Sequence, residues 1–470
     1  MSSFSLFDCQ RGLVVAPAGC GKTQTIVDAL KGHEGRPVLI LTHTNAGVAA
    51  LRGRLKVAQV PTAKFKLATI DGWALRVVAS FPRLSGLTID HSTKLDYPAV
   101  QAAALYAVAS SALAPVFQAT YSRLVVDEYQ DCSMAQHMLV KALAKLLPCC
   151  ALGDPLQRIF DFRNSLLPNW DDVVTVDFPV VETFREPWRW INAEERSFGE
   201  WLLTARDALL ARTPIDLGSA PTNVRWVQLP ASWVDRQRAY SAAINAARVA
   251  KEQSILVIGD EKNRDSRNRF ARTTPGLTVV EPVDLSDLVN AASRIEACSG
   301  VERLVKVLIF ASEVMTDVNP EKICDRLRTL NDGRAKKSTS ASEAACLNLA
   351  RADSFANIRI TLKALTVEEG RRVFRHHLLN GMLDALQRAI SRPGLGLHKA
   401  AISTREAYRA AGHPLPKRAV GSTLLLKGLE AEHAVILNAD TMNTRHLYVA
   451  ISRASKSLTI FSASRILHPA

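Results

Sequence analysis

The stretch of sequence that decides the fold is residues 13–30, LVVAPAGCGKTQTIVDAL. It begins as an apolar, strand-like run, passes through the small-residue loop APAGCGKT at 16–23, and ends in a helix-prone segment. A phosphate-binding loop requires this order of strand, loop and helix. Its small residues let backbone N–H groups wrap phosphates, and the helix N-terminus adds favourable dipole charge. The stretch therefore predicts an α/β core that binds a nucleotide.

Four residues of this loop are candidate nucleotide ligands. Gly19 and Gly21 leave the backbone open to the phosphates, and Lys22 is expected to reach the β and γ phosphates. The hydroxyl of Thr23 is expected to hold Mg²⁺. Ala16 stands where the common pattern of such loops has its first glycine. A nucleoside triphosphate and Mg²⁺ are thus the expected cofactors.

The strand-like run LVVDEYQD, residues 124–131, supplies acidic partners for the loop. It delivers Asp127 and Glu128 at the carboxyl end of a strand, where ligands gather in open α/β sheets. We expect Asp127 to bind Mg²⁺ through water and Glu128 to polarise the attacking water, because phosphoryl transfer depends on positioning and charge stabilisation. Acidic residues commonly end strands, but the phosphate loop upstream makes this pair a candidate catalytic site.

The composition is that of an ordinary folded protein with a positive field. The 470 residues carry a formal net charge of +14, which attracts polyanions, so nucleic acid is the natural partner. A generally basic surface without a specific ligand is the alternative. The 8 cysteines show no zinc-type spacing, and we expect Cys149 and Cys150 to be small core residues. Neither a membrane span nor a leader is recognised, so we expect a cytoplasmic protein with no membrane partner.

Two α/β patterns follow one another along the chain. The first half alternates LVVAPAG, PVLILTHT, RLVVDEY and PCCALGD with helical stretches, and a second pattern runs from TVDFPVVETF to SLTIFSAS. Such alternation indicates parallel sheets flanked by helices. The expected boundaries are a first α/β domain at 1–73 and 119–174, a small helical insertion at 74–118, a second α/β domain at 175–275 and 416–470, and a mainly helical insertion subdomain at 276–415.

Seven segments resemble, in order, the motifs of the UvrD/Rep/PcrA family of superfamily 1 helicases. They are LTHTNAGVAALRGRL at 41–55, ATIDGWALRVV at 68–78, VVDEYQDCSMAQ at 125–136, ALGDPLQRIFDFR at 151–163, VETFRE at 181–186, STLLLKGLEAEHAVIL at 422–437 and RHLYVAISRAS at 445–455. The resemblance covers nearly the whole chain apart from the insertions. It implies an α/β fold with two RecA-like P-loop domains, ATP as the nucleotide and DNA as the partner.

The resemblance also implies roles at the nucleotide. Gln157 resembles the residue that senses the γ-phosphate and links hydrolysis to movement. Phe184 resembles the residue that stacks on the adenine, and Glu430 one that contacts the nucleotide sugar. Arg185 and Arg453 resemble the two arginines that reach the γ-phosphate from the second domain, where positive charge stabilises the transition state. Hydrolysis would then require closure of the two domains.

A second set of positions resembles the lining of the family's single-strand channel. It comprises Thr44, Asn45, Thr69, Trp73, Phe160, Phe162, Arg163 and Thr423, together with His43, which stands in place of the family's phenylalanine. Aromatic faces there would stack bases without reading sequence. For Trp73, core packing is an equal alternative. Asp71 and Leu424 replace family histidines, so DNA contacts at those two positions are open.

The resemblance favours an ATP-dependent helicase or translocase on single-stranded or tailed DNA, with 3′→5′ direction. The alternative is a DNA-dependent regulatory ATPase that controls a separate nuclease, as in the Gabija-type bacterial anti-phage systems with their OLD-like nuclease partner. A remodelling ATPase is a third hypothesis. Gln10 lies closer to Lys22 than the family's adenine-reading glutamine usually does, so adenine selectivity is open.

Overall fold

The computed structural model describes residues 4–89, 95–110, 112–159, 166–247, 253–260, 262–411 and 416–469. The chain divides into two compact units. The first comprises Met1–Gln228 and Ala439–Ala470, and the second comprises Leu229–Asn438. The carboxyl-terminal residues therefore return to the unit that carries the phosphate loop.

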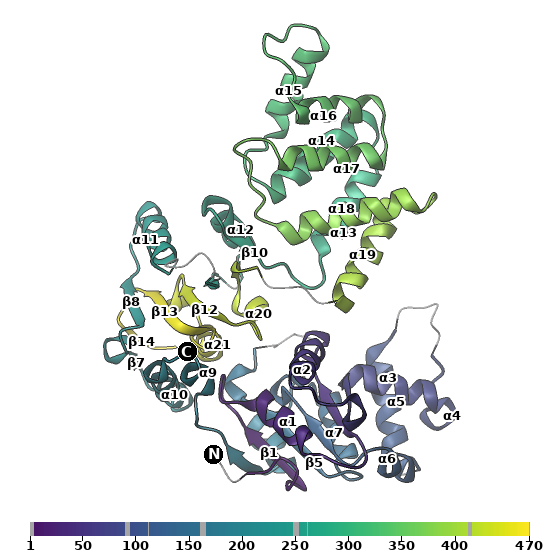
Figure 1. Ribbon diagram of the computed structural model, residues 1–470, viewed down its shortest axis with the longest axis vertical. Coiled ribbons are helices and arrows are strands. Elements are labelled where there is room, and N and C mark those ends of the chain that lie inside the picture. Colours follow the sequence, from purple (N-terminus) through teal and green to yellow (C-terminus); the bar gives the residue numbers. More distant parts are fainter. Residues whose placement is uncertain are drawn as a thin grey trace. The chain divides into compact units, whose positions relative to one another are not determined.

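The first unit is built on a six-stranded sheet in the order β3-β2-β4-β5-β1-β6, with every neighbouring pair parallel (Figure 1). The strands are β1 (Arg11–Val15), β2 (Val38–Thr42), β3 (Phe65–Thr69), β4 (Leu124–Val126), β5 (Cys149–Gly153) and β6 (Val180–Thr183). Strand β6 lies beyond residue 174, where the sequence placed the end of the first α/β domain, yet it pairs with β1. It is an edge strand with Val180 and Val181 exposed, so its pattern does not reveal which sheet it joins.

Alternate residues of the central strands enter two separate cores, because successive side chains of a strand point to opposite faces. Leu39 and Leu41 of β2 lie in one apolar cluster, and Val38 and Ile40 lie in the other. The first core is covered by α3 (Ile70–Ser80), α5 (Tyr97–Ala109), α6 (Ala114–Thr120) and α7 (Met134–Leu143), and the second by α1 (Lys22–Lys31) and α2 (Asn45–Val57). Cys149 and Cys150 are both fully buried, which confirms their expected place in the core.

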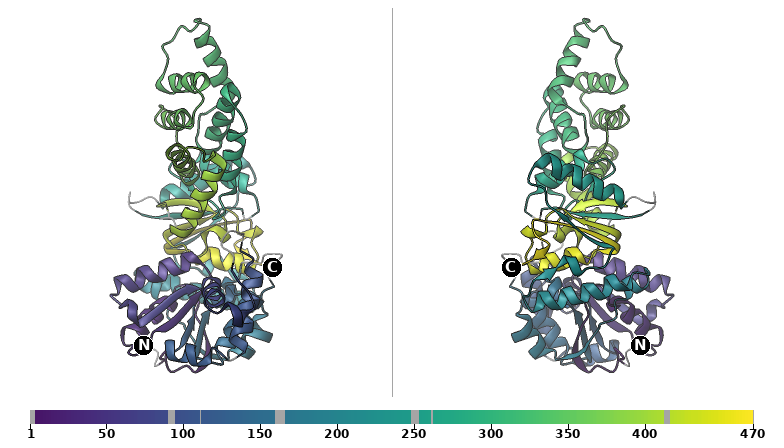
Figure 2. Two further views of the ribbon diagram at one scale, coloured as in Figure 1. Left: turned by 90° about the vertical axis from the view of Figure 1, so that its right-hand side faces the viewer. Right: turned by 90° about the vertical axis from the view of Figure 1, so that its left-hand side faces the viewer.

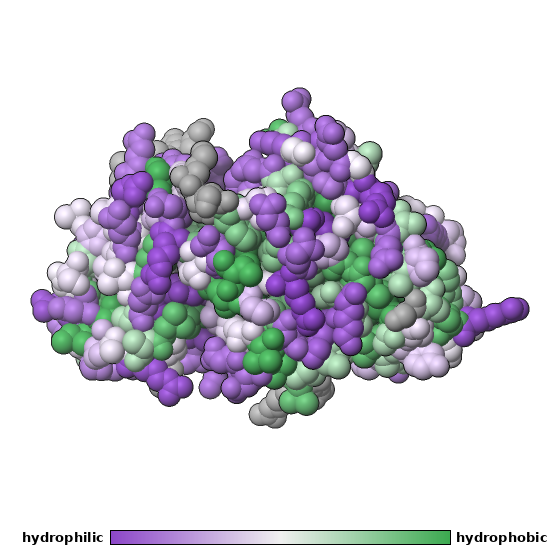
Figure 3. All heavy atoms as spheres, turned by 90° about the horizontal axis from the view of Figure 1, so that it is seen from below, coloured by the Kyte–Doolittle hydropathy of each residue, from purple (hydrophilic) through white to green (hydrophobic). Residues whose placement is uncertain are grey.

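A helical insertion separates β3 from β4. It consists of α3, α4 (Pro82–Ser85), α5 and α6, and α5 packs against both α3 and α7. Within the part of the chain that the structure describes, no single helix is long and apolar enough to cross a membrane, although the bent pair α5 and α6 passes by length and composition. On the face drawn in Figure 3, hydrophilic side chains are spread among small hydrophobic groups.

The second unit carries four strands of the second sheet in the order β10-β11-β9-β12, all parallel. In the first unit β8 (Val224–Gln228) and β13 (Ala454–Ser462) pair in parallel with each other. The four strands are β9 (Ile255–Ile258), β10 (Thr278–Val279), β11 (Arg418–Gly421) and β12 (Ala431–Ile436). Two parallel sheets flanked by helices confirm the expected α/β fold class with two RecA-like domains.

A helical bundle interrupts the second sheet between β10 and β11 (Figure 2). Its apolar core is built from buried leucine, isoleucine, valine and alanine side chains at helical spacing. The helices are α13 (Ser286–Glu296), α14 (Gly300–Val314), α15 (Pro320–Asn331), α16 (Ala341–Arg351), α17 (Phe355–Thr366), α18 (His376–Ser391) and α19 (Leu397–Ala411). This bundle confirms that the insertion is mainly helical.

The remaining helices connect these layers. They are α8 (Thr175–Asp177), α9 (Trp188–Ile191), α10 (Arg196–Leu210), α11 (Trp233–Ala246), α12 (Arg264–Thr273), α20 (Thr423–Leu426) and α21 (Thr444–Ile451). Two short turns after strands of the first sheet, η2 (Tyr129–Asp131) and η3 (Pro155–Gln157), follow the carboxyl ends of β4 and β5.

Candidate nucleotide-binding site

The loop at 16–23 joins β1 to α1, as the sequence predicts. Gly19 and Gly21 have φ angles of 73° and 89°, in the left-handed region that side chains other than glycine rarely adopt. Gly21 forms the N-cap of α1 and has no side chain to satisfy the first N–H groups of that helix. A helix N-terminus with free N–H groups attracts anions. The loop therefore has the backbone shape of a phosphate cradle.

Lys22 lies at the meeting point of this loop and the acidic strand end. Its Nζ lies 2.6 Å from Oε1 of Glu128 and 3.8 Å from Oδ1 of Asp127. Burial lowers the pKa of Lys22, but the carboxylates of Glu128 and Asp127 outweigh that effect and the net shift is upward. Burial raises the pKa of Asp127 to about 6, although Lys22 opposes the shift. The three side chains form one charge-coupled group.

Glu128 adopts an unusual backbone conformation. Its φ of 55° and ψ of 42° place a non-glycine residue in the left-handed region, which costs roughly 1–3 kcal/mol. Its carboxylate accepts a hydrogen bond from the side-chain amide of Gln130, while Oε1 of that amide accepts from the backbone N–H of Asp154 at 3.1 Å. Oε1 of Glu128 thus faces Lys22, and Gln130 binds its second oxygen.

Gln157 lies close to this group and belongs to η3. Its side-chain nitrogen donates to Oδ2 of Asp154 at 3.1 Å, and Asp154 also pairs with Arg206 of α10 at 3.0 Å. Burial lowers the pKa of Arg206, but the Asp154 carboxylate outweighs it and raises the pKa overall. Gln130, Asp154 and Arg206 were not among the residues that the sequence indicated. Gln130 and Asp154 lie within quoted motifs, whereas no local pattern points to Arg206.

Helix α9 covers the phosphate loop. A Cβ atom built on Gly19 would lie 2.4 Å from the Trp190 ring, and one built on Gly21 would lie 3.0 Å from Cδ1 of Trp188. The backbone N–H of Arg189 donates to the carbonyl of Gly19 at 3.0 Å. Glycine is thus required at position 19 by sterics as well as by φ, and at position 21 chiefly by φ. These tryptophans are a further feature that the sequence motifs did not indicate.

The carboxyl-terminal helix α21 also contacts the loop. The buried hydroxyl of Tyr448 accepts a hydrogen bond from the backbone N–H of Ala18 at 3.0 Å. Arg453, directly beyond α21, is 2% exposed, and its Nε donates to the carbonyl of Val449 at 2.7 Å. Trp190 donates from its indole to the carbonyl of Ala454 at 2.9 Å. The structure therefore holds Arg453 in the same unit as the phosphate loop, against the last turn of its own helix.

Phe184 and Arg185 follow β6 at the edge of the first sheet. The Phe184 ring lies against Phe4, with centroids 6.4 Å apart, and its backbone N–H donates to the carbonyl of Val15. Arg185 is exposed and pairs with Asp207 at 2.9 Å. Glu430 is exposed before β12 in the second unit. The roles that the resemblance implies for these residues stay predictions.

The oxygen ligands at the loop fit a magnesium ion bound together with a nucleotide. Thr23 in the first turn of α1 offers a hydroxyl, and Asp127, 7% exposed, offers a carboxylate. Mg²⁺ prefers such hard oxygen ligands and usually keeps waters and phosphate oxygens for the rest. No cluster of three or more His, Cys, Asp or Glu side chains suited to a metal occurs among the described residues. A magnesium held mainly by phosphates and water needs no such cluster.

The residues expected in the single-strand channel take different positions. Thr44 and Asn45 are exposed at the start of α2, and Thr69 caps α3 by accepting from Gly72 N–H at 3.0 Å. Trp73 is 2% exposed and packs against Phe117 in the first core, with ring centroids 5.6 Å apart. Its assignment to the channel was wrong for this structure, because a core ring has no free face for a base.

The other channel positions are distributed over both units. His43 is partly buried after β2, and Thr423 is 1% exposed at the start of α20 in the second unit. Phe160, Phe162 and Arg163 lie outside the described residues. Asp71, which replaces a family histidine, accepts from Gln101 at 2.7 Å and from Gln136 at 2.9 Å. The Asp71 carboxylate thus links α3 to α5 and α7 by hydrogen bonds.

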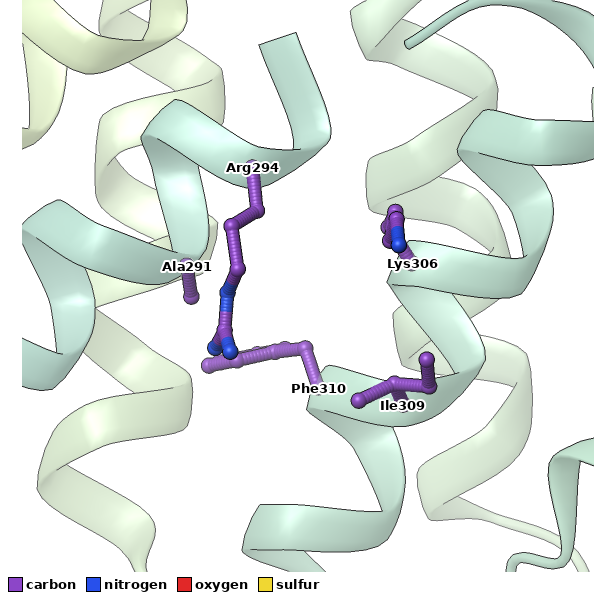
Figure 4. Close-up of a pocket in the computed structure, with 5 residues that line it drawn as sticks. All are labelled: Ala291, Arg294, Lys306, Ile309 and Phe310. Carbon is purple, nitrogen blue, oxygen red and sulfur yellow. The ribbon is translucent and has the colours of Figure 1, made fainter. Parts of the chain in front are cut away.

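A separate pocket lies in the helical bundle, between α13 and α14. It is lined by Ala291, Arg294, Lys306, Ile309 and Phe310, and Arg294 extends toward Phe310 (Figure 4). Its two basic side chains come from facing helices. None of the phosphate-loop residues lines it.

Together the loop, the paired carboxylates and Gln157 form the candidate nucleotide-binding site. Residues 86–174, which include Asp127, Glu128 and Gln157, match the family model of the UvrD/REP helicase N-terminal domain. This part of the chain is similar to the N-terminal domain of UvrD/REP helicases. No curated protein matches it.

Two solved structures are similar to the chain. One is arterivirus nonstructural protein 10, a helicase, in complex with DNA, at 10% identity and a TM-score of 0.35, over 96% of this chain and 60% of that one. The other is a crystal structure of the same arterivirus helicase, at 9% identity and a TM-score of 0.31, over 96% of this chain and 59% of that one. The chain spans about three fifths of the length of these solved chains.

Proposed function

We propose that the chain is an ATP-dependent DNA helicase or translocase that moves on single-stranded DNA in the 3′→5′ direction, with Mg²⁺ as the metal. The observation that carries the proposal is the placement of Lys22 at 2.6 Å from Glu128 and 3.8 Å from Asp127, at the N-terminus of α1. The match of residues 86–174 to the UvrD/REP helicase domain supports the same conclusion. The net charge of +14 favours a polyanionic partner.

The chemistry assigns each side chain a task. ATP bound with Mg²⁺ supplies the transferable phosphoryl group. Lys22 would exchange its contact with Glu128 for phosphate oxygens, and Thr23 and Asp127 would hold the Mg²⁺. Glu128, freed from the lysine, accepts a hydrogen bond from the attacking water and polarises it.

Transfer of the γ-phosphoryl group also needs positive charge near its oxygens. Gln157 faces the same end of the sheet, and we assign it to sensing the γ-phosphate. Arg185 and Arg453 are proposed to neutralise charge that develops on the phosphoryl oxygens. Because Arg453 is buried against α21 in this structure, its part in catalysis requires its side chain to leave the carbonyl of Val449.

For the DNA we propose contacts at the exposed positions of the expected channel. Thr44 and Asn45 follow the carboxyl end of β2, a strand of the same sheet as β1, which precedes the phosphate loop. His43, Thr69 and the segment with Phe160, Phe162 and Arg163 remain part of the proposal, and Trp73 does not. Thr423, which is 1% exposed, would contact DNA only after its side chain becomes exposed. The domain boundaries expected from the sequence also stay a prediction.

A strand-displacement assay tests the proposal. The chain alone, with ATP and Mg²⁺, is offered a 3′-tailed, a 5′-tailed and a blunt duplex. We expect unwinding of the 3′-tailed duplex only. Hydrolysis of ATP without displacement of any strand would favour the alternative of a regulatory ATPase that controls a partner nuclease.

A further inference from the structure

One buried carboxylate, that of Asp154, joins parts of the first unit that are far apart in the sequence. Its Oδ2 accepts from Nε2 of Gln157 at 3.1 Å, and its Oδ1 accepts from Nη2 of Arg206 at 3.0 Å. Its backbone N–H donates to Gln130, whose amide nitrogen donates in turn to Glu128. Asp154 is therefore hydrogen-bonded directly to Gln157, the candidate γ-phosphate sensor. Through the side chain of Gln130 it is also connected to Glu128, the candidate catalytic carboxylate.

Stability alone does not explain the pair of Asp154 and Arg206. The two side chains are 0% and 4% exposed. Removing two charges from water costs free energy that a buried ion pair often fails to recover relative to apolar side chains of similar size. The Nε–H of Arg206 is also buried and lacks a hydrogen-bond partner among the residues that the structure describes. A pair that adds little stability but fixes the direction of a carboxylate points to a positioning role.

Tyr448 of helix α21 connects that helix to the phosphate loop. Its side chain is fully buried, and its hydroxyl accepts from the backbone N–H of Ala18 at 3.0 Å. Burial raises the pKa of Tyr448 well above its ordinary value, and the charge of Asp154 acts in the same direction, so the hydroxyl keeps its proton. Tyr448 thus holds α21 against the loop.

Helix α21 extends the connection to Arg453. The helix packs against η3, the turn that carries Gln157. Arg453 follows the helix directly, and its Nε bonds to Val449 in the last turn. A displacement of α21 therefore moves the arginine with it.

We propose that Asp154, Arg206 and Tyr448 are positioning residues. They hold Gln157 and helix α21 in a fixed position relative to the phosphate loop. The proposal rests on the proposed ATPase function and deepens it. It names the contacts through which a change in the phosphate loop would move Gln157 and Arg453, the residues proposed to act on the γ-phosphate. When the loop backbone shifts around phosphates, the hydroxyl of Tyr448 passes the shift to helix α21, and the packing of α21 against η3 passes it to Gln157. The backbone of Arg453 moves with the end of α21.

The first test compares Tyr448→Phe with Tyr240→Phe. Tyr240 is 5% exposed in the second unit, and its hydroxyl donates to the carbonyl of Leu437 at 2.8 Å, so each change removes one buried hydroxyl. We expect Tyr448→Phe to lower kcat for ATP hydrolysis by roughly tenfold while the Kd for ATP changes by less than about threefold. Tyr240→Phe should leave both close to wild type. Wild-type kcat in Tyr448→Phe would overturn the proposal.

A second measurement separates this proposal from the proposed function. Hydrogen exchange of the nucleotide-free chain should become faster in Tyr448→Phe at both 16–23 and 154–157, and in neither segment in Tyr240→Phe. Arg206→Lys, which keeps the charge but loses the planar fork, should speed exchange at 154–157 in the same way. Faster exchange confined to α21 would overturn the network. Absence of ATP hydrolysis in the wild type would contradict the proposed function and would leave the exchange result to decide the network by itself.

Discussion

Nζ of Lys22 lies 2.6 Å from Oε1 of Glu128, so the lysine expected to bind phosphates is paired with the carboxylate expected to activate water. The pair is partly buried, with side-chain exposures of 10% and 33%. Phosphates that enter the loop must compete with Glu128 for the lysine. Under the proposed function, binding of the nucleotide would release the carboxylate of Glu128 in the same event.

The first prediction concerns this competition. Lys22→Ala should abolish ATP binding and hydrolysis, because it removes the phosphate contact. Glu128→Gln should abolish hydrolysis but bind ATP at least as tightly as wild type, and up to roughly fivefold more tightly, since removal of a competing ion pair is worth about 1 kcal/mol. Equilibrium binding of a fluorescent ATP analogue measures both. A Glu128→Gln chain with near-normal turnover would remove Glu128 from catalysis.

The second prediction concerns Arg453. Arg453→Ala should abolish turnover and change ATP affinity by less than about tenfold, because loss of a transition-state contact acts on rate more than on ground-state binding. Arg453→Lys should not restore turnover, since an ammonium cannot copy the planar guanidinium fork. Steady-state hydrolysis and a binding titration of the three proteins provide the measurement. Full activity of the lysine variant would show that catalysis does not need the guanidinium and that Arg453 is structural.

The third prediction uses the tryptophan beside the loop. Trp188 is 40% exposed and its ring lies next to Gly21, so nucleotide binding should change its emission. We expect the ATP-dependent change in tryptophan fluorescence to be lost in Trp188→Phe. Trp233 is 50% exposed at the start of α11 in the second unit, and Trp233→Phe should keep the change. An unaltered signal in Trp188→Phe would place the reporting tryptophan elsewhere.

The fourth prediction separates backbone strain from steric clash. Gly86 has a φ of 69° and open space around it, so Gly86→Ala should lower the free energy of unfolding by about 1–2 kcal/mol from strain alone. Gly19 has a φ of 73°, and a Cβ there would meet the Trp190 ring at 2.4 Å. Gly19→Ala should therefore cost more stability and also weaken ATP binding. Chemical denaturation of the two variants measures the difference, and equal losses would mean that Trp190 yields without cost.

The fold was predictable from the sequence where its signals are local. The loop at 16–23 and the apolar run of β4 specify strand, turn and helix within a few residues of each other, so their placement followed from pattern alone. The sheet that β6 joins did not follow, because an exposed edge strand shows little apolar pattern and its partner β1 lies far back in the chain. Pairing between strands that are distant in the sequence is decided by packing in the folded chain. A short stretch of sequence therefore does not predict it.

The site shows the same division. Lys22 and Glu128 were found because each lies in a short motif with a chemical reason for its residue type. Arg206 was not found, because its partner Asp154 lies 52 residues away and only the folded chain brings them together. Trp73 shows the opposite error, since an aromatic residue within a DNA-type motif proved to fill a core. Burial, which the motif does not encode, decides between the two roles.

Under the proposed function, this site hydrolyses ATP in response to single-stranded DNA. The most direct measurement is the rate of ATP hydrolysis by the wild-type chain, with and without a mixed-sequence single strand, over a series of salt concentrations and with Lys22→Ala as the control. We expect stimulation by the strand, little dependence on sequence, a steep loss of apparent DNA affinity as salt rises, and no hydrolysis by the control. Hydrolysis that no strand stimulates at any salt concentration, or that survives in Lys22→Ala, would contradict the account.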